Sequence, residues 1–217
     1  MSILAGGHLQ RLRSYLKTIF AGDLTQSNEP SQAKDFLYEL WLASIFTELG
    51  FEVSLAEPDI IISGNGLTDA LGIACKFPSS MQQVHPHLSK GYKQIRNQAL
   101  RGVVAIGLDL LVSRTAFPNG IRFIDFRQGD KHPLDVAQRH ANEATEELVS
   151  SRTVKYPSED PADGLLMTLT IGGIFGDPAS LLFVTAMTLQ CDDSNPIQKD
   201  LMRIYEANQM FQRGPED

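Results

Sequence analysis

Residues 58–79 read PDIIISGNGLTDALGIACKFPS and contain two short β-prone runs with a turn between them. The first run begins with Asp59 after a proline, and the second carries Lys76 near its end. The Gly-Asn-Gly sequence that separates the runs is typical of a turn. Because side chains alternate along a strand, position 74 shares a face with Lys76, and Asp59 is expected to lie opposite that face across the sheet.

Further elements flank these two strands in a regular order. The helix before them is predicted from a capping residue, Ser31, and from Gly50, which can end it. A helix between two strands after them predicts a crossover connection and a mixed sheet. The predicted elements are a helix at 31–49, strands at 51–55, 59–63 and 71–77, a helix at about 88–100 and a buried strand at 103–112. The sequence therefore predicts an α/β fold with an αβββαβ core and a mixed central sheet.

The remaining segments are expected to pack around this core. Leucines at helical spacing predict an amphipathic helix at residues 9–20. After the core, a strand, a helix, a β-hairpin and a last helix are predicted at 121–126, 133–152, 165–189 and 196–211. The expected organisation is a helix and loop at 1–30, the core at 31–127, and a C-terminal elaboration at 128–217 packed on the same domain.

The composition is that of an ordinary globular protein. The chain has 217 residues, 42% of them apolar and 21% charged, and can bury one large core. A formal net charge of −7 gives no overall attraction to nucleic acid, so such binding would need a local basic patch. Cys75 and Cys191 have no zinc-type spacing and indicate no disulfide framework, which fits a reducing, cytoplasmic location. No uninterrupted apolar run is long enough to predict a membrane span.

The order of elements and their polar residues resemble the PD-(D/E)xK, or restriction endonuclease-like, nucleases. The resemblance covers roughly residues 34–111. Within it, Glu39 matches the helical acidic residue, Asp59 the metal-binding aspartate and Lys76 the motif lysine. Gln94 or Gln98 matches the glutamine found on the following helix in several branches.

This resemblance implies a Mg²⁺-dependent endonuclease that hydrolyses phosphodiester bonds, with Mn²⁺ as an alternative ion and with DNA favoured over RNA. It implies that Asp59 and Glu39 bind the metal and that Lys76 is catalytic. Carboxylate oxygens hold Mg²⁺ against a phosphate, and a lysine can position the attacking water and offset phosphate charge. The family further suggests a bacterial or mobile-element role in nucleic-acid processing or defence, and a homodimer or a complex with other subunits.

The chain departs from the family pattern at Ala74, where the family has Asp or Glu, and a methyl group cannot bind a metal. One hypothesis is that Ala74 replaces an acid and leaves the enzyme inactive or crippled, as a deliberate inactivating change would. The alternative is a natural variant in which Glu39, or else Glu57 or Asp69, supplies the missing ligand. A second function also stays open: a catalytically dead nuclease fold that serves as a nucleic-acid-binding or protein-interaction subunit.

Positive charge gathers on the helix that follows the strand of Lys76. This charge predicts a phosphate-contacting patch, although a solvated helix face would have the same pattern. The expected nucleic-acid contacts are Lys90, Lys93, Gln94, Arg96, Gln98 and Arg101.

Other chemistry-bearing residues receive structural interpretations. His85 and His87 flank Pro86 in an expected loop, where exposure to solvent is favoured over metal binding. Cys75 is expected to be buried on the face opposite to Ala74. Trp41 lies on a helix that is apolar almost all round, so it is expected to belong to the core rather than to stack on bases.

Overall fold

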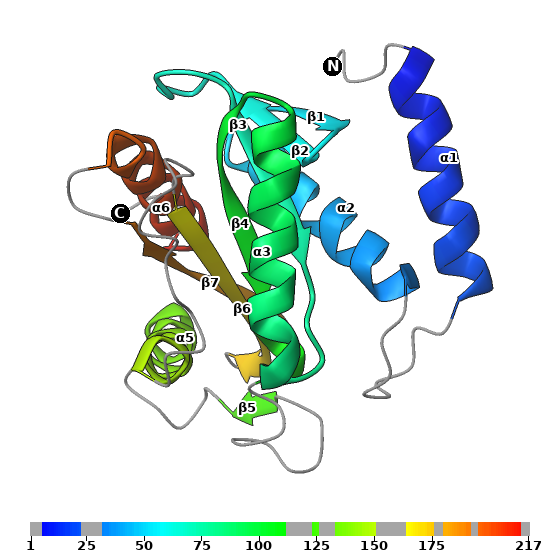
Figure 1. Ribbon diagram of the computed structural model, residues 1–217. Helices are drawn as coiled ribbons and strands as arrows, with labels where there is room; N and C mark the ends of the chain where they lie inside the picture. Colours follow the sequence, from blue (N-terminus) through cyan, green and yellow to red (C-terminus); the bar gives the residue numbers. More distant parts are fainter. Residues whose placement is uncertain are drawn as a thin grey trace.

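The protein is organised around one mixed β-sheet with helices on both faces (Figure 1). The computed structural model describes residues 6–22, 32–111, 123–125, 133–150, 164–175, 180–191 and 195–213. Within these residues the sheet has seven strands in the order β1-β2-β3-β4-β6-β5, with β7 also paired to β6. The predicted α/β class is confirmed.

The first part of the sheet follows the predicted order of a helix, three strands, a helix and a strand. Helix α2 precedes an antiparallel meander of β1, β2 and β3, and helix α3 then crosses over to β4, which runs parallel to β3. The bounds are α2 Gln32–Glu48, β1 Glu52–Ala56, β2 Asp59–Ser63, β3 Leu71–Lys76, α3 Met81–Asn97 and β4 Arg101–Gly107. The crossover makes the sheet mixed, as expected.

The C-terminal part of the chain extends the same sheet. Strand β6 pairs with β4 in parallel and forms a long antiparallel hairpin with β7. The bounds of the remaining elements are α1 Gly6–Ala21, β5 Phe123–Asp125, α5 Pro133–Ser150, β6 Gly164–Phe175, β7 Ser180–Gln190 and α6 Gln198–Arg213. Helix α1 lies on the outer side of α2 and also contacts β1 (Figure 1).

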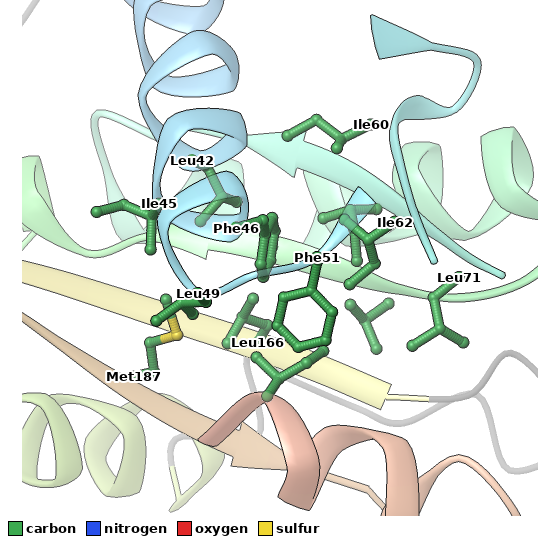
Figure 2. Close-up of a cluster of buried hydrophobic side chains, with 14 of the residues drawn as sticks. Leu42, Ile45, Phe46, Leu49, Phe51, Ile60, Ile62, Leu71, Leu166 and Met187 are labelled. Atoms are coloured by element: carbon green, nitrogen blue, oxygen red, sulfur yellow. The ribbon is translucent and has the colours of Figure 1, made fainter. Parts of the chain in front are cut away.

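Two hydrophobic clusters fill the two faces of the sheet, and the alternation along β3 divides its residues between them. Ile73 and Cys75 belong to the cluster under α2 and α6, whereas Ala74 belongs to the cluster under α3 and α5. Figure 2 shows the first cluster, in which Leu42 and Phe46 of α2 meet side chains from the sheet. This packing holds α2 firmly against β2 and β3.

The end of α2 is fixed by the glycine that the sequence indicates. Gly50 has a φ of +84°, a conformation that favours glycine. The Phe51 amide donates to the Phe46 carbonyl and the Gly50 amide donates to the Thr47 carbonyl, which is the Schellman pattern. The Phe46 and Phe51 rings pack edge to face, with their centroids 6.1 Å apart. Strand β1 therefore leaves the helix in one direction and starts the meander.

Helix α3 begins at Met81, earlier than predicted, so His85 and His87 lie on a helix and not in a loop. Ser80 occupies the N-cap position without a side-chain capping bond. The Gln83 side chain accepts hydrogen bonds from the amide and the hydroxyl of Ser79, which fixes the chain just before the helix. Pro86 lies inside the helix, where it costs one backbone hydrogen bond without ending the helix.

Strand β4 ends at Gly107, whereas the sequence predicted a strand up to residue 112. Among the described residues, no helix is long and apolar enough to cross a membrane.

Candidate functional site

Asp59 and Lys76 meet at one end of the β2–β3 pair, because β2 begins where its antiparallel partner β3 ends. The Lys76 ammonium donates to Asp59 Oδ2 at 3.1 Å and to the Cys75 carbonyl at 2.7 Å. The same carboxylate oxygen accepts the Cys75 backbone amide at 2.8 Å. Asp59 and Lys76 are 6% and 8% exposed, so this is a buried ion pair. The predicted juxtaposition of the acid and the lysine is present.

The electrostatics of Asp59 reflect burial. Removal from water raises the pKa of Asp59, and the charge and hydrogen bond of Lys76 and the Cys75 amide oppose that rise without cancelling it. The carboxylate thus carries a charge whose lost hydration is incompletely replaced. A cation beside it would be favourable.

Glu39 on α2 joins this pair. It is 6% exposed, and its Oε2 has no hydrogen-bond partner within the described part of the chain. Burial, and then the negative charge of Asp59, raise the pKa of Glu39 to about 7, against smaller opposing effects of Tyr15, Arg11 and Lys76. Glu39 and Asp59 are therefore close enough to repel each other. The helical acid and the strand acid form one pair.

Helix α1 covers the acids with two residues that the sequence analysis did not select. An NH₂ group of the Arg11 guanidinium lies 4.0 Å from Asp59 Oδ1, and its Nε donates to the Tyr15 hydroxyl at 2.9 Å. The Tyr15 ring stacks on Phe36 of α2, with centroids 4.0 Å apart. The available signal was their spacing, because residues four apart share one face of a helix.

Helix α3 brings its own polar groups from the other side. Gln94 donates from Nε2 to the Pro58 carbonyl at 3.2 Å, next to Asp59, while its buried Oε1 has no partner among the described residues. Burial, together with the positive charges of Lys76 and Lys90, lowers the pKa of His87. His87 thus lies near Lys76, in surroundings that favour the neutral imidazole. Because the sequence predicted a loop at His87, it did not predict that His87 lies near Lys76.

The remaining predicted residues lie outside the cluster. Lys90, Lys93, Arg96 and Gln98 are exposed on or at the end of α3. Arg101 is placed at the opposite end of the β3–β4 pair, since Leu71 pairs with Arg101 and Lys76 with Ile106. It forms ion pairs with Asp69 at 3.4 Å and with the buried Asp200 at 3.1 Å, which ties β4 to α6. Asp69 is thereby also far from Lys76, and Glu57 is exposed.

Ala74 lies in a tightly packed place. It is fully buried, and a Cβ added to Gly91 of α3 would lie 3.3 Å from the Ala74 methyl and 2.8 Å from Val104. The two small residues let α3 pack directly on β3 and β4. This close packing explains why a small residue occupies position 74. It favours the hypothesis that Glu39 supplies the second acid over the hypothesis that Ala74 replaces an acidic residue.

Glu39 and Asp59 are suited to a Mg²⁺ ion. No group of three or more His, Cys, Asp and Glu side chains that could hold a metal occurs among the described residues. Zinc takes three or four such ligands, whereas Mg²⁺ is commonly held by one or two carboxylates and keeps several waters. The unpartnered Oε2 of Glu39 is an oxygen of the kind that Mg²⁺ binds, and a cation would relieve the repulsion between the two acids.

No family model matches the chain, and neither a curated protein nor a solved structure is significantly similar to it. Its function must therefore be argued from the geometry of the site.

We predict that Glu39 makes the metal-free protein less stable as the pH rises. Its pKa of about 7 in the fold exceeds the ordinary 4.5, so the folded state binds the extra proton between these values. Stability therefore falls from pH 4.5 to 7 and stays low above that. Glu39→Gln should remove this slope and raise the free energy of unfolding by about 2–3 kcal/mol at pH 8, with little gain at pH 4.5.

Urea denaturation at several pH values in EDTA measures this effect, with Glu48→Gln on the exposed end of α2 as the control. Mg²⁺ should raise the melting temperature of the original chain at pH 8 and that of Glu39→Gln much less. Identical pH slopes for the original chain and Glu39→Gln would contradict the prediction.

A second prediction concerns position 74. Ala74→Glu should lower the free energy of unfolding by about 3 kcal/mol or more, because a carboxylate would be forced between β3 and Gly91. Ala74→Ser, with little added volume, should cost much less. Calorimetry with and without Mg²⁺ distinguishes the two hypotheses: if Mg²⁺ restores Ala74→Glu to the original melting temperature, position 74 is a metal position after all.

Proposed function

We propose that this protein is a Mg²⁺-dependent nuclease of the PD-(D/E)xK kind in which Glu39 takes the place of the acid absent at position 74. The observation that carries this proposal is the buried cluster of Glu39, Asp59 and Lys76, with Lys76 3.1 Å from Asp59 and an oxygen of Glu39 lacking a partner. The connectivity from α2 to β4 supports it, because it is the order of elements that the family shares.

The energetics of the cluster favour a functional explanation. Two acids with raised pKa values in a largely buried place destabilise the fold, and a buried ion pair seldom contributes more than an apolar pair of the same volume. Strongly perturbed pKa values with specific charged neighbours gather at functional sites. We infer that the cluster is kept for chemistry.

Each residue of the cluster has a role in phosphodiester hydrolysis. Glu39 and Asp59 would hold Mg²⁺, which when bound polarises the phosphate and makes a bound water acidic. Lys76, oriented by Asp59 and by the Cys75 carbonyl, offsets the negative charge that grows on the phosphate. Gln94 fixes the start of β2 to α3 through the Pro58 carbonyl. Neutral His87 is able to accept a proton beside Lys76.

The substrate that we propose is DNA rather than RNA. On a chain of net charge −7, the exposed Lys90, Lys93 and Arg96 on α3 supply the local positive charge that phosphate contacts need. We further propose a cytoplasmic location, in keeping with Cys75 and Cys191, which form no disulfide, and action as a homodimer or with other subunits. A role in bacterial defence belongs to the same proposal.

One observation favours a second candidate, a nuclease fold without catalysis that binds nucleic acid or protein. The Arg11 guanidinium lies 4.0 Å from Asp59 Oδ1 and brings a second positive charge to the carboxylate, whose other oxygen is bonded by Lys76 and the Cys75 amide. A permanent Arg11 contact would make the site a structural ion pair.

Cleavage of plasmid DNA, single-stranded DNA and RNA, with Mg²⁺, Mn²⁺ or EDTA, tests the proposal. Metal-dependent cleavage by the original chain is expected, and Glu39→Gln, Asp59→Asn and Lys76→Met should each lower the rate by about 100-fold or more. Glu48→Gln and Lys17→Met are matched controls away from the cluster.

Cleavage that appears only with Ala74→Glu would show an inactivated enzyme instead. If no variant cuts, yet DNA binds in a salt-dependent manner, the non-catalytic candidate replaces the proposal.

A further inference from the structure

A pocket of about 290 Å³ is lined in part by Tyr38 and Phe77, the sequence neighbours of Glu39 and Lys76. Its walls are mainly the side chains of Leu37, Tyr38, Trp41 and Phe77, and Lys34 and Asp109 add one charge of each sign. The volume is near the lower end of the range of about 300–1,000 Å³ for small-molecule sites, so it suits one small, flat group. None of the roles assigned above to Glu39, Asp59 or Lys76 uses this pocket.

The fold ties this pocket to the site. Lys34, Tyr38 and Trp41 recur at helical spacing on α2, on a face adjacent to the one that carries Glu39. Phe77 directly follows Lys76 in the sequence. Asp109 follows β4, and strands β3, β4 and β6 all point their carboxyl ends the same way. Ligands of open α/β sheets commonly bind outside such carboxyl ends.

The aromatic wall is rigid. The Tyr38 ring stacks on Trp41, with centroids 5.9 Å apart, and on Phe77, with centroids 5.2 Å apart. The Tyr38 hydroxyl is hydrogen-bonded to Thr168 Oγ1 at 2.9 Å, which fixes the middle ring. Gly107 allows this arrangement, because a Cβ there would lie 3.1 Å from the Tyr38 ring and would collide with Phe77. Tyr38 is buried, whereas Trp41 and Phe77 are half-buried and reach the pocket.

The polar residues of the pocket match the edge of a heteroaromatic ring. The Lys34 ammonium is a hydrogen-bond donor, and the Asp109 carboxylate, which accepts the Thr170 amide at 3.2 Å, is an acceptor. Nucleobases present both donors and acceptors on their edges and a flat face that stacks on aromatic side chains.

We propose that this pocket binds one unpaired nucleobase of the nucleic acid whose phosphate lies at Lys76. This inference rests on the proposed function and narrows its substrate to single strands or to duplexes from which a base is extruded. A base in the pocket would fix the register of the strand, since Phe77 and Lys76 are adjacent in the chain.

The chain contains a single tryptophan, Trp41, so its fluorescence reports directly on the pocket. The experiment titrates the full chain, in Ca²⁺ to prevent turnover, with a short single-stranded oligodeoxynucleotide and with an abasic strand of equal length and charge. Binding is followed by anisotropy of a label on the strand. Saturable quenching of Trp41 by the base-containing strand alone is the expected result.

Variants extend the test. Trp41→Leu should weaken binding of the single strand by about 10- to 100-fold, whereas Trp41→Phe should retain most of the affinity. Phe20→Ala, which removes an 83% exposed aromatic ring on α1, is the matched control and should have no effect. Circular dichroism melts check that each variant is folded.

Strands that bind without quenching Trp41, or an abasic strand that quenches equally, would overturn the base pocket and leave the nuclease proposal intact. If no nucleic acid binds at all, the proposed function fails and this inference fails with it.

Discussion

The buried contact between Asp59 and Lys76 is the constraint on which the arrangement of the site depends. Asp59 Oδ2 accepts both the Lys76 ammonium and the Cys75 backbone amide, so the side chain of β2 takes over a hydrogen bond at the end of β3. Burial of these charges costs hydration that their mutual attraction only partly returns. The contact therefore requires β2 and β3 to stay in one register, and the isoleucines of β2 under α2 hold that register.

Helix α2 links the stability of the fold to the chemistry of the site. Leu42 and Phe46 pack into the core that Figure 2 shows, while Glu39, less than one turn before Leu42, is held beside Asp59. A helix anchored by its apolar side can keep an ionisable group in a place where that group alone would not stay. The same anchoring holds Tyr38 and Trp41 at the pocket, so acids and aromatic rings keep fixed relative positions.

The sequence predicted those parts of the fold whose signals are local. Alternation and turn residues define β2 and β3, and Gly50 ends α2 as expected. The start of α3 was missed because Pro86 was given more weight than the residues before it, where Gln83 bonds Ser79 at the start of the helix. Proline removes a single hydrogen bond there, which the packing of the helix outweighs.

Contacts between distant segments explain what the sequence did not predict in the site. Arg11 reaches Asp59 from α1. No local pattern in the sequence indicates which face of an amphipathic helix meets a strand far along the chain. Trp41 packs against the core, as expected, but a helix that is apolar almost all round does not reveal that the same side chain also lines a pocket. The pocket is complete only with β4 and β6 in place, since Asp109 and Thr170 also line it.

The positions of Ala74 and Glu39 form one solution to a packing problem. An acid on β3 would need space between the sheet and α3, and Gly91 and Ala74 leave none. An acid on α2 approaches Asp59 from the opposite side and leaves the contact between α3 and the sheet intact. The carboxylate pair is thus compatible with close helix–sheet packing, although burial and then repulsion by Asp59 raise the pKa of Glu39. A bound cation would relieve that repulsion, which makes the apolar residue at position 74 consistent with a working metal site.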